Sequence, residues 1–182
     1  MLETVIFLLG SIGFIILSRQ SLINPSSHGF PRFIAFEGIL GLVVLNAHLW
    51  FSQPFSISQM ISWTLLLISA FLAINAFWVL RKYGKADHSI RDDSRTEFEK
   101  TTRLVTNGPY QFIRHPLYAS LLGLAWGIFL NHISPLSGAL VVLVSLTLFL
   151  TAIYEERENL RSFGEEYASY MRHTRRFIPF LF

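Results

Sequence analysis

The chain has 182 residues, a length that suits a single domain. Hydrophobic residues make up 52% of it and charged residues only 15%, whereas a soluble domain usually carries about 25% charged residues. Together with a mean hydropathy of +0.44, this composition indicates an integral membrane protein. The absence of cysteine excludes disulfides, cysteine-ligated zinc and a cysteine nucleophile. The net charge of +3 does not predict nucleic-acid binding, because the basic residues flank apolar segments.

A transmembrane helix needs about 20 mostly apolar residues. The expected spans, in chain order, are 2–18, 33–51, 57–80, 118–130 and 136–154. The first lacks a basic segment before its apolar run, so we expect a retained helix rather than a cleaved signal peptide. The sequence therefore predicts an all-α membrane bundle of about five transmembrane helices in one domain, residues 1–182. Residues 1–80 supply three of these helices, and the last two spans form a helical hairpin followed by an amphipathic cytoplasmic tail.

The basic residues set the expected orientation, since Lys and Arg favour the cytoplasmic side of a membrane. They lie in the first loop, in the charged linker 81–103 with its extension to Arg114, and in the tail, whereas the second and fourth loops contain none. Five spans with an external N-terminus put all of them inside. We therefore expect a protein of the bacterial inner (plasma) membrane with a cytoplasmic C-terminus. This threading also places residues 104–118 and 154–170 on the same, cytoplasmic face.

The stretch 104–118 reads LVTNGPYQFIRHPLY and contains an Arg-His-Pro triplet. Pro116 suits the first position of a helix, so Arg114 and His115 should lie at the mouth of the fourth span. Free backbone N–H groups at such a mouth favour an anion such as a carboxylate or a phosphate. Taken alone, the triplet is more often a simple anchor at the lipid headgroups.

The same stretch contains a Gly-Pro turn and two tyrosines. Gly108 would let the backbone approach a ligand closely. Tyr110 and Tyr118 could stack on a ring or bond through their hydroxyls, but they could equally belong to the interfacial aromatic belt.

Glu155 and Glu156 directly follow the fifth apolar segment. The helix dipole disfavours carboxylates at a helix C-terminus, so we expect the helix to continue past them. These acids could bind an amino group or a ribose, or they could form a solvated charged face. The next residues, SFGEEYASY at 162–170, predict one amphipathic helix on the membrane, with its aromatic face used for packing.

Polar residues inside the spans are weaker candidates. Glu37 is a possible site residue that could pair with Arg32, whereas Asn46 and His48 are expected at the outer interface. No His, Asp or Glu spacing predicts a metal site, and no glycine-rich phosphate loop is present.

The order of these motifs resembles the isoprenylcysteine carboxyl methyltransferases and the related phospholipid N-methyltransferases. LVTNGPYQFIRHPLY, a helical hairpin and EERENLRSFGEEYASYMRHTRRFIPF carry the resemblance, which covers about residues 101–182. It implies a small membrane enzyme that uses S-adenosylmethionine to methylate a lipid or lipophilic acceptor, with residues 101–182 as the cofactor-binding module. The cofactor would lie between the segment before the hairpin and the helix after it. By matching position, the implied cofactor residues are Leu104, Val105, Gly108, Tyr110, Arg114, His115, Pro116, Tyr118, Glu155 and Glu156.

One position departs from the resemblance. The carboxyl methyltransferases carry an arginine one helical turn before the acidic pair, where this chain has Thr151. The methyl acceptor is therefore open among a carboxylate, an amine and a thiol. Methyl transfer by direct displacement depends mainly on alignment, so no catalytic base is assigned.

Two other hypotheses stay open beside the methyltransferase. One is a sterol- or polyprenol-type membrane reductase with a nicotinamide cofactor, because some of these carry a similar Arg-His-Pro pattern. The other is a non-catalytic membrane scaffold. The sequence predicts no oligomeric state.

Overall fold

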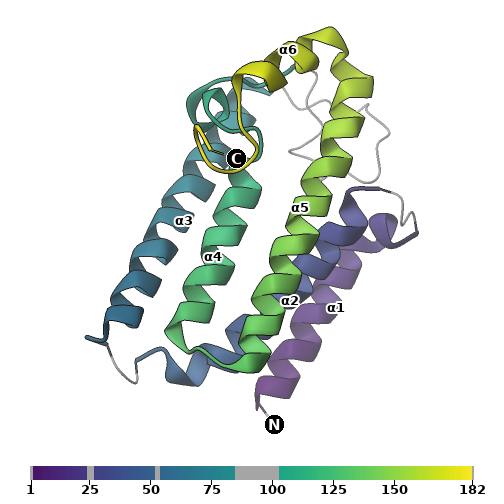
Figure 1. Ribbon diagram of the computed structural model, residues 1–182. Coiled ribbons are helices and arrows are strands. Elements are labelled where there is room, and N and C mark those ends of the chain that lie inside the picture. The colour runs from purple at the N-terminus through teal and green to yellow at the C-terminus, as the bar shows by residue number, and fades with distance from the viewer. Residues whose placement is uncertain (1, 24–26, 52–53, 85–102, 182) are drawn as a thin grey trace.

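The computed structural model describes residues 2–23, 27–51, 54–84 and 103–181, and within these ranges it contains helices and no β-strand (Figure 1). The helices are α1 (Leu2–Ile23), α2 (Gly29–Asn46), η1 (Ala47–Leu49), α3 (Ile57–Tyr83), η2 (Gly108–Gln111), α4 (Pro116–Asn131), α5 (Pro135–Phe163) and α6 (Glu165–His173). Four of them, α1, α2, α3 and α5, are long and apolar enough to cross a membrane, and α4 is a shorter apolar helix. The predicted all-α membrane bundle is confirmed. Most of the charged linker 81–103 falls in 85–102, outside the described residues.

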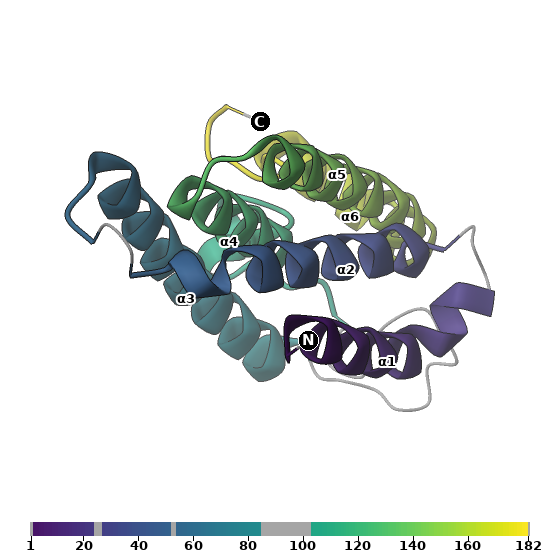
Figure 2. The ribbon, with the colours of Figure 1, turned by 90° about the horizontal axis from the view of Figure 1, so that it is seen from below.

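Helices α1 to α5 lie side by side, and α6 crosses one end of the bundle (Figure 1). Seen along the bundle, α2 lies between α1 and α5, and α4 lies between α3 and α5 (Figure 2). The N-terminus of the chain is at the end opposite to α6. Consequently the start of α2, the start of α4 and the end of α5 are all at the α6 end, where the candidate site is found.

Local sequence signals explain where α3 and α5 begin. Ser56 caps α3 by accepting a hydrogen bond from the backbone N–H of Gln59. Ser134 and Ser137 form a reciprocal capping box at the start of α5, and Pro135 occupies its first position.

The first two helices differ from the sequence expectation. Helix α1 continues to Ile23, and α2 begins at Gly29 instead of after Arg32. Gly29 and Pro31 are residue types that often interrupt a helix, but here they lie in the first turn of α2, where a proline needs no N–H partner. As a result His28 becomes the residue that flanks the helix start.

The end of α5 confirms one expectation and contradicts another. Helix α5 continues past Glu155 to Phe163, as the helix-dipole argument predicted. The single amphipathic helix predicted for 162–170 is wrong, because Gly164 adopts φ +55° and separates α5 from α6. Glycine tolerates this left-handed backbone, which turns α6 across the end of the bundle.

Helix α4 packs very closely on α3 through small residues. Ser62 and Ser69 of α3 donate hydrogen bonds of 2.7 and 2.6 Å to backbone carbonyls of α4. A Cβ atom on Gly127 would lie 2.9 Å from the Leu66 side chain and 3.3 Å from the Ser62 carbonyl oxygen. Small residues and hydroxyl hydrogen bonds are typical of helix pairs in membranes. This packing fixes α4, whose first residues belong to the site.

The polar residues inside the spans have structural partners. Ser11 of α1 donates a 2.7 Å hydrogen bond to the Glu37 carboxyl group. Asn46 was expected at the interface but is buried, and its side-chain amide donates to the Leu42 carbonyl oxygen. His48 is exposed and lies 3.5 Å from Glu3.

Candidate functional site

The turn at η2 is held between two helices. Gly108 has φ +58°, and a Cβ atom there would lie 2.9 Å from a methyl group of Val79 on α3. The Tyr170 hydroxyl of α6 donates a 2.5 Å hydrogen bond to the Tyr110 carbonyl oxygen. The close approach that Gly108 permits is therefore an approach to α3.

The start of α4 is bound to the C-terminal tail. The backbone N–H of Arg114 donates to the Arg175 carbonyl oxygen at 2.7 Å, and that of His115 donates to the Arg176 carbonyl oxygen at 3.1 Å. These two N–H groups were expected to be free for an anion. They are instead satisfied by the chain itself, since the tail forms a short parallel bridge at Ile113 and Arg175.

Glu156 lies in a buried ion cluster behind this junction. Its carboxylate is 2.8 Å from Arg114 Nε and 2.6 Å from Arg176 Nη2, and its side chain is only 6% exposed. Arg114 also donates to the Thr174 carbonyl oxygen at 2.5 Å. Charge-assisted hydrogen bonds of this kind are the strong ones, so the cluster ties the tail to α4 and α5.

The neighbouring acid, Glu155, points to the other side of His115. It accepts a 2.6 Å hydrogen bond from the Tyr118 hydroxyl and lies 3.8 Å from His115 Nδ1, and its side chain is 24% exposed. The His115 ring stacks on Tyr118 with 5.5 Å between ring centroids. The carboxylates of Glu155 and Glu156 therefore lie on two sides of the His115 ring. Glu155 lines a cavity, whereas Glu156 is buried in the ion cluster.

His115 itself is buried, with a side chain 2% exposed. Its Nε2 atom is 3.4 Å from a Glu156 oxygen, which is within ion-pair range, yet the geometry is not that of a hydrogen bond. Among the described residues this nitrogen has no hydrogen-bond partner. Nε2 thus faces the buried Glu156 cluster, whereas Nδ1 is the ring nitrogen on the side of Glu155 and the cavity.

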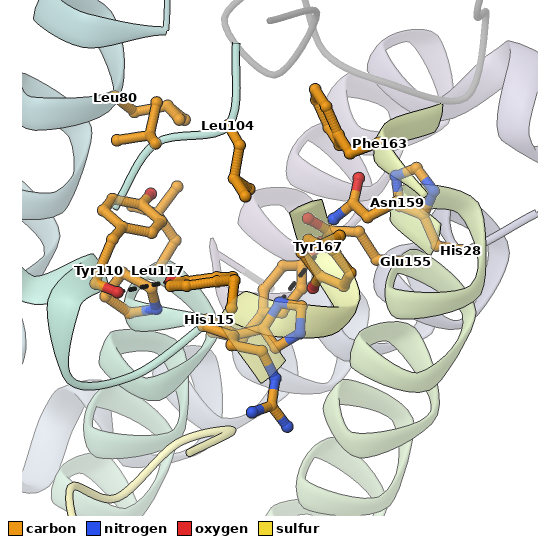
Figure 3. Close-up of a pocket in the computed structure, with 15 residues that line it drawn as sticks. His28, Leu80, Leu104, Tyr110, His115, Leu117, Glu155, Asn159, Phe163 and Tyr167 are labelled. Carbon is orange, nitrogen blue, oxygen red and sulfur yellow. Dashed lines mark hydrogen bonds and ion pairs between the residues drawn. The ribbon is translucent and has the colours of Figure 1, made fainter. Parts of the chain in front are cut away.

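A cavity of about 720 Å³, part of it open to solvent, lies between these elements (Figure 3). Its lining includes eight of the ten residues that the sequence assigned to a cofactor: Leu104, Val105, Tyr110, Arg114, His115, Pro116, Tyr118 and Glu155. Gly108 and Glu156 do not line it. The geometry thus brings both predicted halves of the site together around one space, whereas contact with a cofactor stays a prediction.

Seven further residues line the cavity: His28, Leu80, Leu117, Asn159, Phe163, Tyr167 and Tyr170. A spacing signal could have identified two of them, because Asn159 and Phe163 follow Glu155 by one and two turns of the same helix face. Tyr167 and Tyr170 had been assigned to packing alone. His28 gave no such signal, since it directly precedes α2 and is far from the other lining residues in the sequence.

His28 is 1% exposed and pairs with α5. Its Nδ1 atom lies 2.6 Å from Glu158 Oε2, and its backbone N–H donates to Glu158 Oε1 at 3.3 Å. Burial alone would lower the pKa of His28. The hydrogen bond to Glu158 and the nearby charge of Glu155 outweigh burial and Arg32, so the pKa of His28 is raised above its usual value.

The two tyrosines of α6 are neutral hydrogen-bonding groups. Burial raises the pKa of Tyr167 well above its usual range, although a hydrogen bond with Asn159 opposes the effect. Burial likewise raises the pKa of Tyr170, against the opposing charge of Arg114. Both phenols therefore keep their protons at any physiological pH.

The cavity has two chemically different sides (Figure 3). Glu155, Asn159 and His28 are gathered on one side, whereas Tyr110, Leu117 and Leu80 lie on the other. Such a space suits a ligand that carries charged and hydrogen-bonding groups at one end and a ring or apolar group at the other.

Comparison with known families defines the class of this membrane protein. The sequence model described as phospholipid methyltransferase matches residues 57–166, and the chain belongs to this family. The matched region contains α3, η2, α4 and the acidic pair of α5. It begins after His28 and ends before the tail that binds Glu156.

The names of similar curated proteins describe a narrower class than the family's name does. The chain is similar to proteins named "Probable protein-S-isoprenylcysteine O-methyltransferase" from Oryza sativa subsp. indica and subsp. japonica. Each is 33% identical over 106 residues, which cover 57% of this chain and 56% of the relative. The chain thus matches about half the length of these curated relatives.

Proposed function

We propose that this protein is a membrane methyltransferase that uses S-adenosylmethionine and methylates a lipid or lipophilic acceptor. One observation carries the proposal: residues 104–118 and residues 155–170 enclose the same cavity at the ends of membrane-spanning helices. These are the two motifs whose order resembles the membrane methyltransferases. Membership of the phospholipid methyltransferase family supports the same class of reaction.

The residues of the cavity fit the chemistry of this cofactor. Glu155 can bind an ammonium group, and Asn159 can bond a hydroxyl or an amide-like ring edge. Tyr110 and Phe163 offer aromatic faces for a purine.

When bound, S-adenosylmethionine would supply a methyl group on a positively charged sulfur, which a nucleophile can take by direct displacement. The protein's task is then to align the reactants and exclude water. The hydrogen bond from Tyr118 to Glu155 and the stacked ring of His115 fix the polar side. Leu80 and Leu117 supply apolar surface on the opposite side.

The acceptor is proposed by class only. Thr151 is fully buried, its hydroxyl donates to the Thr147 carbonyl oxygen, and it does not line the cavity. It therefore supplies no charge to an acceptor, and a carboxylate, an amine and a thiol all stay open. A lipophilic acceptor fits because the cavity adjoins helices long enough to cross a membrane. The relatives' names and the family's name both point to lipidated or lipid acceptors.

We also propose that the cavity faces the cytoplasm. Basic residues gather at this end of the bundle: Arg81 and Lys82 at the end of α3, and Arg172, Arg175 and Arg176 in and after α6. Lys and Arg are retained on the cytoplasmic side of membranes. The opposite end carries no Lys or Arg among its described turn residues, 47–51, 54–56 and 132–134.

Calorimetry on the purified protein in detergent or nanodiscs tests the proposal. S-adenosylmethionine and S-adenosylhomocysteine should bind with a saturable signal, and NADPH should not. Binding of NADPH alone would replace the methyltransferase with the reductase hypothesis. Binding of none of the three would leave the scaffold hypothesis.

A further inference from the structure

The amino-acid part of S-adenosylmethionine carries a positive ammonium group and a negative carboxylate group. The cavity needs a residue of opposite charge for each of them. Glu155 is suited to the ammonium group. The expected place for the carboxylate was the start of α4, but the N–H groups of Arg114 and His115 donate to the tail. The Arg114 side chain is likewise engaged with Glu156 and Thr174. The carboxylate therefore requires another cation.

His28 is in the right place to be that cation. It lines the cavity on the same side as Glu155 and Asn159 (Figure 3). Glu158 holds one ring nitrogen, Nδ1, at 2.6 Å. The contact between the His28 ring and Glu158 uses only Nδ1. When the ring is protonated, the second ring nitrogen, Nε2, also carries a hydrogen that it can donate to a ligand.

We propose that His28 binds the carboxylate of the methyl donor's amino-acid part through Nε2, beside Glu155, which binds the ammonium group. This inference rests on the proposed function and names the part of the ligand that α2 recognises. It makes α2 a component of the binding site, although α2 lies outside the region that the family model matches, 57–166.

The charges around His28 support a protonated ring. Glu158 and Glu155 face it from α5, and Arg32 lies one turn away on α2. Two carboxylates against one guanidinium favour the imidazolium form. Glu158 also accepts from the backbone N–H of His28, so the ring is held in one orientation at the start of α2.

A simpler role for the same contacts is a tether that caps α2 and holds it against α5. A tether would affect every ligand equally, because it would act through the shape of the cavity. Binding of the carboxylate would affect only ligands that have an amino-acid part. Two ligands that share adenine, ribose and sulfur separate these roles: S-adenosylhomocysteine carries the amino-acid part, whereas 5′-methylthioadenosine lacks it.

The test measures both affinities by calorimetry for the wild type and three variants. His28→Gln removes the positive charge, His28→Lys keeps a cation that can still pair with Glu158, and His48→Gln is a control at the far end of the bundle. We expect His28→Gln to weaken S-adenosylhomocysteine binding by about tenfold and to leave 5′-methylthioadenosine within about twofold. His28→Lys should recover most of the loss, and His48→Gln should match the wild type.

An equal loss for both ligands in His28→Gln, or no loss for either, would overturn the inference and leave the proposed function intact. A wild type that binds neither S-adenosylmethionine nor S-adenosylhomocysteine would overturn both.

Discussion

Two adjacent carboxylates, Glu155 and Glu156, should respond to the same substitution in opposite ways. Each is changed to glutamine, which keeps the shape and removes the charge. Glu156→Gln should destabilise the fold and affect ligand binding only through that loss. Glu155→Gln should leave the fold nearly unchanged and weaken the binding of S-adenosylmethionine.

The expected magnitudes follow from the surroundings of each residue. Glu156 is 6% exposed, and its loss leaves two guanidinium groups without their carboxylate. Removing one partner of a buried ion pair costs about 3–5 kcal/mol. Arg176 is 22% exposed and can be partly hydrated, so we expect about 3 kcal/mol for Glu156→Gln. At about 3 °C per kcal/mol for a chain of this size, the melting temperature should fall by about 10 °C.

Glu155 is 24% exposed, and a glutamine oxygen there can still accept the Tyr118 hydroxyl. The melting temperature of Glu155→Gln should therefore stay within about 3 °C of the wild type, equal to about 1 kcal/mol. Loss of the charge that faces the donor's ammonium group should weaken binding by about tenfold, or about 1.4 kcal/mol.

Thermal unfolding in one detergent, followed by circular dichroism, gives the first quantity, and calorimetry with S-adenosylmethionine below the melting temperature gives the second. The opposite result would be that Glu155→Gln unfolds at a temperature as low as that of Glu156→Gln. This result would refute the distinction between Glu156, which belongs to a buried ion cluster, and Glu155, which lines the cavity. Unchanged affinity in Glu155→Gln would refute its place in the binding site.

Three further predictions concern other parts of the molecule. His115→Ala should weaken S-adenosylmethionine binding by about tenfold, measured by calorimetry, and unchanged affinity would place the ligand elsewhere. Gly127→Leu should cost about 1–3 kcal/mol by forcing α3 and α4 apart, whereas Gly13→Leu, with no atom within 4 Å of its Cβ, should be neutral in the same thermal assay. The raised pKa of His28 means that its ion pair stabilises the fold fully below about pH 6.5 and less as pH rises through the folded pKa. The melting-temperature difference between the wild type and His28→Gln should shrink from pH 5.5 to pH 9, and a difference that grows with pH would contradict the charged form.

The helices could be predicted because their signals are local. Apolar segments of sufficient length indicated the spans, and Ser134 with Pro135 marks the start of the last one. The start of α2 was misplaced because Gly29 and Pro31 read as breakers, although both residues are tolerated in a first helical turn. A positive φ at Gly164, which splits the expected tail helix, depends on where α6 must pack.

The site was only partly predictable, because some of its contacts join segments that are distant in the sequence. The order of the two motifs brought His115 and Glu155 into one hypothesis, and helical spacing from Glu155 could have added Asn159. The parallel pairing of Arg175 and Arg176 with the start of α4 leaves no local pattern, because it joins segments about sixty residues apart. The contribution of His28 depends on how α2 packs against α5, which a single sequence does not encode in any short motif.

We propose that the protein binds S-adenosylmethionine in this cavity and transfers its methyl group to a lipophilic acceptor. The most direct measurement incubates membranes that contain the protein with methyl-labelled S-adenosylmethionine and counts the label in the organic-soluble fraction. We predict label in that fraction for the wild type and for His48→Gln, and a large reduction for Glu155→Gln at equal protein levels. Label at the background level for the wild type, or equal label with Glu155→Gln, would contradict the account.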